Sequence, residues 1–153
     1  MAFKSLNQFL PLRRKIIGAR KRWINFRVGV DFHPTVIISL STRFVTRQRG
    51  MITVGSETLI AFKTLIISYD PRAAVDRPVK IGRRCFIGGG STVLPGVTIG
   101  DESVVAAGAI VQHDVPSRCV VAGNPARIVS RNIEVGPFGH FLKPVQTPPS
   151  THS

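Results

Sequence analysis

The sequence predicts an all-β fold in which a short helical segment precedes a β-helix, a chain that coils around a three-sided prism. A repeat of six residues runs through the middle of the chain, and 14 Gly and 11 Pro provide turn residues. A repeat of fixed period is typical of folds in which each unit packs only on its neighbours. The composition, with 43% hydrophobic residues, is that of a globular chain.

Each repeat begins with an aliphatic residue, usually followed by Gly or Ala, and has a small residue at its fifth position. The leading residues are Val54, Ile60, Ile66, Ile81, Ile87, Val93, Ile99, Val105 and Val111. The fifth positions hold Thr58, Thr64, Cys85, Ser91, Val97, Ser103, Ala109 and Val115, and Asp70 interrupts this series. A strand of two or three residues followed by a turn points each leading side chain inward. Small residues suit the tight corners.

Departures from the repeat indicate how the chain is divided. Ile66 and Ile81 are 15 residues apart, so residues 71–80 are expected to leave the prism as an excursion loop bracketed by Asp-Pro and Arg-Pro turns. The β-helix domain is expected over residues 28–133, with less regular coils at its beginning. Residues 134–153 contain four of the prolines and are expected to form a flexible tail.

Residues 1–27 are expected to form a basic helical segment. Its larger apolar residues fall roughly on one helical face, namely Leu12, Ile16, Trp23 and Ile24. Such a segment can cover the open end of the prism, whose edge is otherwise unpaired. It can also lie on an anionic membrane surface. Both hypotheses stand at this point.

Charge is concentrated at the start of the chain. The net charge is +13, and residues 1–49 hold eleven Lys or Arg against the single acid Asp31. This end is expected to attract anionic partners such as lipid head groups, lipid-linked sugar phosphates or coenzyme A. Nucleic acid is disfavoured as a partner, because the sequence has neither a series of stacking aromatics nor a recognisable binding motif.

The apolar runs and the cysteines of the sequence predict that the protein is cytoplasmic, with the inner face of the membrane as the alternative location. No stretch approaches 18 consecutive apolar residues, and basic residues interrupt the N-terminal apolar positions, which argues against a spanning segment or a secretory signal. Cys85 and Cys119 form neither a metal-type cluster nor a disulfide framework, and both are expected to be buried.

Residues 78–129 contain the strings LPGVTIG and VVAGNPARIV. With these strings the segment resembles the hexapeptide-repeat acetyltransferases, which include maltose, galactoside, serine and polysaccharide O-acetyltransferases. This resemblance implies a left-handed parallel β-helix, which is an exception to the usual right-handed crossover. It also implies a homotrimer with active sites between neighbouring prisms, and acetyl-CoA as acyl donor. The acceptor would be a hydroxyl or amine, of a sugar or a cell-surface polysaccharide intermediate.

The resemblance also implies a set of residues that bind coenzyme A, namely Gly89, Ala107, Gln112, His113, Arg127 and Arg131. Gly89 and Ala107 would line a slot for the thin pantetheine arm, although corner geometry alone also explains small residues there. Arg127 and His113 would hold the phosphates, and a guanidinium can contact a phosphate at two points. His113 stands where Lys is commoner in the family.

The catalytic assignment departs from the family. O-acetylating relatives carry a His before the excursion loop, and the equivalent position here is Tyr69, between Ser68 and Asp70. Three hypotheses remain open. An amine acceptor could arrive unprotonated and need only proximity, Asp70 could act as base or orient the acceptor, or His33 could reach across a trimer interface. Tyr69 is expected to act as a hydrogen-bond donor.

Two other functional classes share the β-helix fold. A trimeric β-helix that binds a partner without catalysis is supported by the missing His, whereas retention of AGNPAR argues against it. A carbonic anhydrase of the same fold requires three His around zinc. Only His33 and His113 lie in the helical part, so no metal is expected. Arg72, Asp76 and Arg77 in the loop are expected to reach the acceptor, or else to be solvated.

Overall fold

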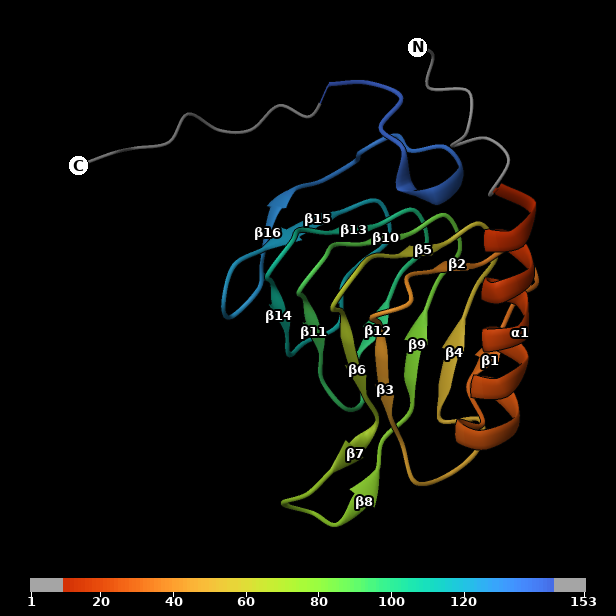
Figure 1. The fold of residues 1–153 in the computed structure, drawn as a ribbon. Coiled ribbons are helices and arrows are strands. Elements are labelled where there is room, and N and C mark those ends of the chain that lie inside the picture. The colour runs from red at the N-terminus through yellow and green to blue at the C-terminus, as the bar shows by residue number, and fades with distance from the viewer. Residues whose placement is uncertain (1–9, 145–153) are drawn as a thin grey trace.

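The computed structural model describes residues 10–144 and shows a left-handed parallel β-helix with three flat walls (Figure 1). The first wall consists of β1 (Asp31–Phe32), β4 (Ile52–Val54), β9 (Val79–Ile81) and β12 (Thr98–Ile99). The second consists of β2 (Ile37–Ile38), β5 (Leu59–Ile60), β10 (Phe86–Ile87), β13 (Val104–Val105), β15 (Val120–Ala122) and β16 (Arg127–Ser130). The third consists of β3 (Arg43–Val45), β6 (Leu65–Ile67), β11 (Thr92–Val93) and β14 (Ile110–Val111). The predicted fold class is confirmed.

The core is a column of stacked aliphatic side chains. All nine predicted leading residues are buried, and each is in register with its equivalent in a neighbouring coil. In the second wall, for example, Ile60 is in register with Ile87, and Ile87 with Val105. Burying one such side chain contributes roughly 1.5–3 kcal/mol, so the column is the main stabilising feature of the chain.

The repeat begins one coil earlier than the sequence indicated. Phe32, Ile38 and Phe44 are six residues apart and pair with Val54, Ile60 and Ile66 of the following coil. The rings of Phe32 and Phe44 meet edge to face, with their centroids 5.3 Å apart. Aromatic residues at two leading positions concealed this coil in the sequence, where residues 28–50 seemed irregular.

Three corners join the walls, and each has its own chemistry. The first corner, between the first and second walls, has positive φ at Glu57, Arg84, Glu102 and Arg118. There Arg84 lies 2.8 Å from Glu57 and 3.8 Å from Glu102, so opposite charges stack along the corner. The corner between the second and third walls, called here the glycine corner, has positive φ at Lys63, Gly90 and Gly108.

The corner between the third and first walls carries the excursion. β7 (Tyr69–Asp70) and β8 (Val75–Asp76) form an antiparallel hairpin that projects from the prism (Figure 1). The sequence indicated an excursion loop over 71–80, whereas the hairpin starts at Tyr69 and the chain rejoins the first wall at Val79. This corner is called the hairpin corner below.

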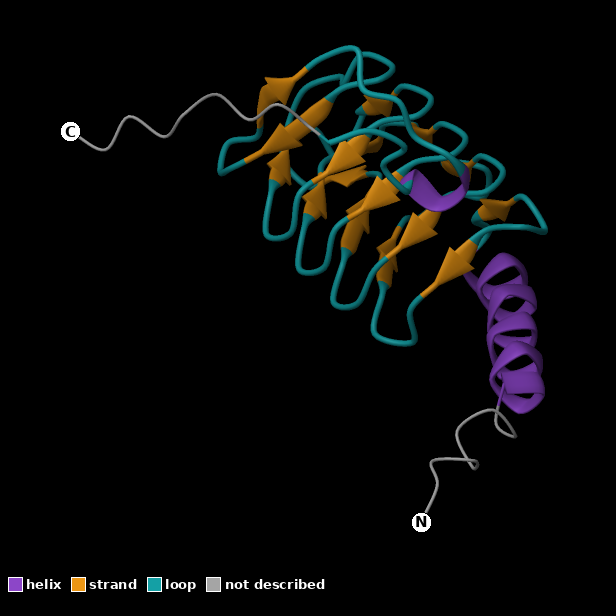
Figure 2. Ribbon diagram, turned by 90° about the horizontal axis from the view of Figure 1, so that it is seen from above, coloured by secondary structure: helices purple, strands orange, loops and turns teal. Residues whose placement is uncertain are grey.

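Helix α1 (Leu10–Val28) covers one end of the prism (Figure 2). Ile24 is buried in the core, and Ile17 and Val28 pack against it. Arg20 and Lys21 fasten the helix to the first coil. Arg20 donates to the carbonyls of Ser39 and Thr42, and Lys21 donates to those of Pro34 and Val36, at distances of 2.7–3.0 Å. Burial lowers the pKa of Lys21.

The predicted single apolar face of this segment is wrong. Ile24 points into the core, but Ile16 and Trp23 lie on another side of α1, where 47% and 58% of their surfaces are exposed. The side chain of Leu12 lies outside the described residues. Ile24 thus lies on a different face of the helix from Ile16 and Trp23, because the prism contacts only a narrow stripe of α1.

The opposite end of the chain folds back onto the outside of the second wall. β16 runs antiparallel to β15, which ends the coil, and a short 3₁₀ helix (Pro137–Gly139) follows. Ile133 and Val135 are buried against Val104, Val120 and the ring of Phe86. The sequence indicated a flexible tail from residue 134, whereas residues 134–143 cover these outward apolar side chains. Residues 145–153, including His152, lie outside the described part.

Replacing one core isoleucine should separate burial from strand propensity. Ile37 and Ile38 are neighbours in β2, but Ile38 is 1% exposed and Ile37 is 39% exposed. Ile38→Ala should lower the free energy of unfolding by about 2–5 kcal/mol because it leaves a cavity. Ile37→Ala should cost far less in the same denaturant titration. Equal losses for the two variants would contradict the assignment of the inner face.

The buried thiol of Cys85 gives a second prediction. Burial raises its pKa from 9.0 to about 11, so iodoacetamide should label it only after unfolding. The folded state keeps this proton while the unfolded state loses it, so the free energy of unfolding should fall between about pH 9 and pH 11. Cys85→Ala should show a smaller fall over that range. An identical fall would exclude Cys85 as its source.

Candidate active site

A strip of exposed backbone runs along the glycine corner. Gly89 and Ala107 occupy equivalent positions in successive coils, and the N–H of Gly108 donates to the carbonyl of Gly89 at 2.9 Å. The N–H of Gly90 donates to the carbonyl of Phe62, also at 2.9 Å, in the coil below. The structure therefore brings together the two residues predicted to line a pantetheine slot.

Backbone geometry favours glycine in this strip but does not demand it. Gly90 and Gly108 have φ near +70°, and a Cβ built on either would meet no heavy atom within 4 Å. The same left-handed turn position holds Lys63, Arg84 and Glu102 elsewhere in this chain. Side chains are thus tolerated at such turns, although at some cost. Glycine at these two places leaves the corner without side chains.

The two ends of the strip differ in chemistry. At one end the ring of Phe62, 61% exposed, lies against Gly89, and a Cβ on that glycine would come within 2.8 Å of it. At the other end Arg127 pairs with Ala122 in the last turn of the coil. Its guanidinium is exposed and donates to the carbonyl of Ala126 at 3.0 Å, so most of its donors face solvent. Phe62 was not among the residues that the sequence indicated, although it occupies the position equivalent to Gly89 in the preceding coil.

The remaining coenzyme A candidates lie on other corners. Gln112 and His113 follow β14 and are exposed on the hairpin corner. Arg131 follows β16, whose end pairs with the start of β15, and so lies near the first corner. Within a single chain, only three of the six candidates lie on the same corner, namely Gly89, Ala107 and Arg127.

The hairpin corner holds the two catalytic candidates. The guanidinium of Arg47 lies 3.8 Å from the centre of the Tyr69 ring, a cation–π contact that the sequence did not indicate. The Asp70 carboxylate accepts from the backbone N–H of Arg72 at 3.0 Å and lies 3.7 Å from Arg77 Nε. Asp70 thus caps the turn of the hairpin.

Asp76 anchors the base of the hairpin. Its Oδ1 accepts from the buried Ser68 hydroxyl at 2.9 Å and from the backbone N–H of Arg47 at 3.2 Å. Thr46 Oγ1 lies 3.4 Å from the same oxygen. The sequence suggested that Asp76 could reach an acceptor or be solvated, but these contacts turn it toward the prism. Arg72 and Arg77 are exposed.

His33 lies elsewhere in the chain. It is exposed at the first corner in the first coil, and its Nδ1 is 2.9 Å from Thr35 Oγ1. The hairpin projects from a different corner, so His33 does not join Tyr69 within one chain. Over residues 10–144, the structure gathers no three His, Cys, Asp or Glu side chains as metal ligands.

Known proteins share this repeat and fold. The protein-family model described as the hexapeptide repeat of succinyl-transferase matches residues 78–113. The Bacillus subtilis protein YvoF is 44% identical over 80 residues, covering 51% of this chain and 46% of that protein. The galactoside O-acetyltransferase of Escherichia coli is 32% identical over 114 residues, covering 69% of this chain and 53% of that enzyme.

Among solved structures, the polySia specific acetyltransferase NeuO aligns with a TM-score of 0.59 and 29% identity, over 69% of this chain and 52% of that one. The chain spans about half the length of these curated relatives. The repeat, the three-walled coil and the shared sequence agree. The chain carries the hexapeptide repeat over residues 78–113 and is similar in sequence and fold to acetyltransferases.

Proposed function

We propose that this protein is an acetyl-CoA-dependent acyltransferase that acetylates a hydroxyl or amine of a sugar or cell-surface polysaccharide intermediate. The observation that carries the proposal is the bare strip at the glycine corner, which ends at the exposed Arg127. Such a strip offers backbone amide groups to a thin amide-bearing chain, and the guanidinium suits a phosphate. The likeness to acetyltransferases, including one named for galactosides, supports acetyl as the group transferred.

The division of the candidates between corners supports an assembly of three chains. A groove between two prisms would place the glycine corner of one chain opposite the hairpin corner of the next. Gln112 and His113 would then join Gly89, Ala107 and Arg127 around one donor. A cyclic trimer would repeat this groove three times. In this arrangement each site is built from two copies of the chain.

Catalysis in this proposal rests chiefly on positioning. The acceptor atom attacks the thioester carbonyl, the C–S bond breaks so that coenzyme A leaves as its thiolate, and the acceptor's proton passes to that thiolate through solvent. The Asp70 carboxylate already accepts from a backbone N–H of the hairpin turn and lies beside Arg77. We therefore assign Asp70 the role of orienting the acceptor and not that of a base. Tyr69 would donate a hydrogen bond to the acceptor or to the developing oxyanion. An amine that arrives unprotonated fits this set best, because it needs no enzymatic base.

A second candidate function is a trimeric binding protein without catalysis. Tyr69 at the usual His position, with Asp70 committed to the hairpin turn, favours it. The two functions differ in turnover, since both retain the strip. Binding of acetyl-CoA without turnover of any sugar or amino sugar would favour the binding protein. Absence of acetyl-CoA binding would contradict the acyltransferase.

Arg127→Ala should weaken binding of acetyl-CoA by about 1–3 kcal/mol, because a charge-assisted contact to phosphate is lost. Isothermal titration calorimetry measures this directly. Arg83→Ala is the matched control, since Arg83 is an exposed arginine on the first corner that pairs with Asp101. Equal effects of the two substitutions would remove Arg127 from the site.

Ala107→Phe should abolish acetyl-CoA binding while leaving the fold intact. Ala107 is exposed at the corner, so a larger side chain projects into the strip without entering the core. Calorimetry at matched concentration tests binding, and the denaturation midpoint tests folding. Unchanged affinity in a folded variant would place the donor elsewhere on the molecule.

Tyr69→Phe should lower kcat about tenfold, the loss expected for one hydrogen bond, with little change in acetyl-CoA affinity. Initial rates with the best acceptor, measured beside acetyl-CoA calorimetry, separate the two effects. A loss of donor affinity instead of kcat would place Tyr69 in the donor site.

A further inference from the structure

Helix α1 has two apolar stripes that face in different directions. The inner stripe of Ile17, Ile24 and Val28 packs on the core. An outer stripe, defined as Ile16, Ala19, Trp23 and Phe26, follows the spacing of a single helix face. Its three large members are 47%, 58% and 70% exposed. The inner stripe already covers the end of the prism, so the fold does not require the outer one.

Basic side chains border the outer stripe on both sides. Lys15 and Arg22 project along one flank of α1 and Arg27 along the other, and all three are exposed. The helix contains no acidic residue. Arg49 joins this border from the loop after β3. It donates to the carbonyl of Phe26 at 2.6 Å, and its guanidinium lies 5.9 Å from the centre of the Phe26 ring.

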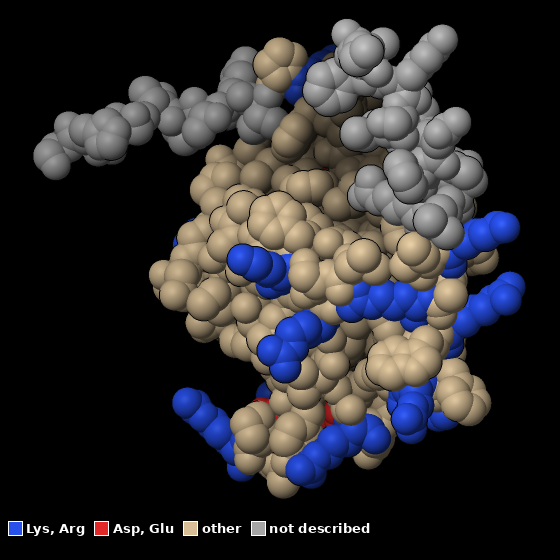
Figure 3. Space-filling model, in the orientation of Figure 1, with Lys and Arg blue, Asp and Glu red and all other residues tan. Residues whose placement is uncertain are grey.

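The space-filling view agrees with this arrangement. Figure 3 shows Lys and Arg side chains on the α1 side of the molecule and also across the centre and lower edge of the same face, with acidic side chains barely visible there. A single face therefore combines exposed large apolar groups with uncompensated positive charge. That combination favours an anionic surface over a neutral one.

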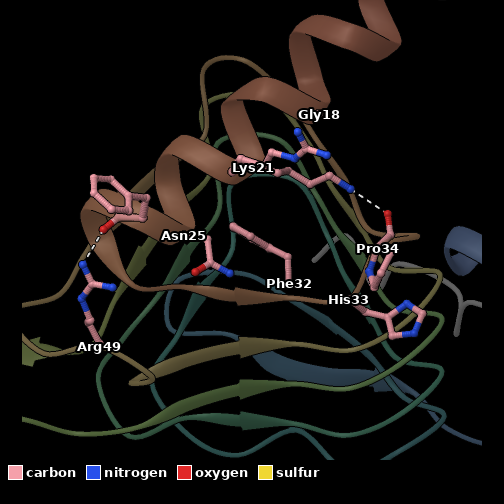
Figure 4. A pocket seen from close by; sticks show the side chains of 9 residues that line it. Gly18, Lys21, Asn25, Phe32, His33, Pro34 and Arg49 are labelled. Atoms are coloured by element: carbon pink, nitrogen blue, oxygen red, sulfur yellow. Dashed lines mark hydrogen bonds between the residues drawn. The ribbon is translucent and has the colours of Figure 1, made fainter.

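A groove beside the outer stripe offers room for an anionic head group. It has a volume of about 590 Å³ between α1 and β1, and no acidic residue lines it. In Figure 4, Lys21 reaches across from the helix to the carbonyl of Pro34, while Arg49 and His33 lie at the two ends. Arg22 also lines the groove. A phosphate there would meet several hydrogen-bond donors.

We propose that α1 is a peripheral membrane anchor that lies in the surface of an anionic bilayer. The rings of Trp23 and Phe26 enter the boundary between head groups and acyl chains, and Lys15, Arg22 and Arg27 contact lipid phosphates. α1 lies in the surface in this arrangement, because no described helix is long and apolar enough to cross a bilayer. This proposal does not depend on the acyltransferase activity.

A second copy of the chain is a poorer occupant of the same face. Two outer stripes in a symmetric contact would bring two acid-free, basic helices together, which like-charge repulsion opposes. An anionic bilayer satisfies the apolar stripe and its basic borders together. The two occupants also differ in what an experiment would detect.

Trp23 is the only tryptophan in the chain, so its fluorescence reports on this stripe alone. The full chain would be mixed with vesicles of phosphatidylcholine, or of phosphatidylcholine with roughly one-third phosphatidylglycerol. We expect a blue shift, quenching by brominated acyl chains and co-sedimentation with the anionic vesicles alone. Raising NaCl to about 0.5 M should release the protein.

Variants identify the residues responsible. Arg22→Gln combined with Arg27→Gln should weaken partitioning into anionic vesicles about 25-fold, since each charge near such a surface contributes about fivefold. Phe26→Asn should reduce both partitioning and the blue shift. The controls are Lys80→Gln, an exposed cation on the first wall, and Leu142→Asn, a 63% exposed leucine near the C-terminal segment. Neither control should change partitioning.

Two results would overturn the proposal. The first is an unchanged Trp23 spectrum with anionic vesicles while the unfolding midpoint shows a folded chain. The second is a blue shift that grows with protein concentration in the absence of lipid, which would identify a second copy as the occupant. Equal losses in the control variants would also contradict it, because the effect would then follow total charge or hydrophobicity.

Discussion

The structure depends on one constraint, the in-register stacking of inward aliphatic side chains from coil to coil. Each leading Ile or Val sits beside its equivalent, and the backbone between them forms a parallel ladder. A coil alone would leave both its apolar side chains and its backbone groups exposed to water. Stacking satisfies both at once, so the period of six residues has to be kept wherever the column continues.

Because the walls are taken up by the core and the ladder, the corners carry the variable chemistry. The first corner stacks Glu57, Arg84 and Glu102 and so pairs its own charges. The glycine corner presents bare backbone at Gly90 and Gly108, which hold the same turn position. The hairpin corner admits an insertion, since a chain can leave and return there without disturbing the stacked residues. In the proposed function the donor residues and the acceptor residues lie on different corners, so the proposed site is built from more than one chain.

Two segments outside the coils, helix α1 and the C-terminal residues 134–143, cover apolar surfaces of the prism. The helix α1 uses a narrow stripe and the ties from Arg20 and Lys21 to close one end. The C-terminal segment covers Phe86, Val104 and Val120 on the outside of the second wall. The C-terminal segment buries Val135 but leaves Leu142 63% exposed, whereas α1 combines its exposed apolar face with basic borders. The proposed membrane contact uses the outer stripe of α1, which is not needed to close the end of the prism.

The sequence by itself determined the coil, its nine inward aliphatics and the small residues at its corners, because a period of six follows directly from strand and turn lengths. It also located Gly89, Ala107 and Arg127, whose motifs are local in the chain. Only the tertiary structure decided that Gln112 and His113 lie on another corner, that Asp76 is anchored by Ser68 and Thr46, and that α1 has two apolar stripes. These features arise from contacts between segments far apart in the chain, for which no local period or motif exists.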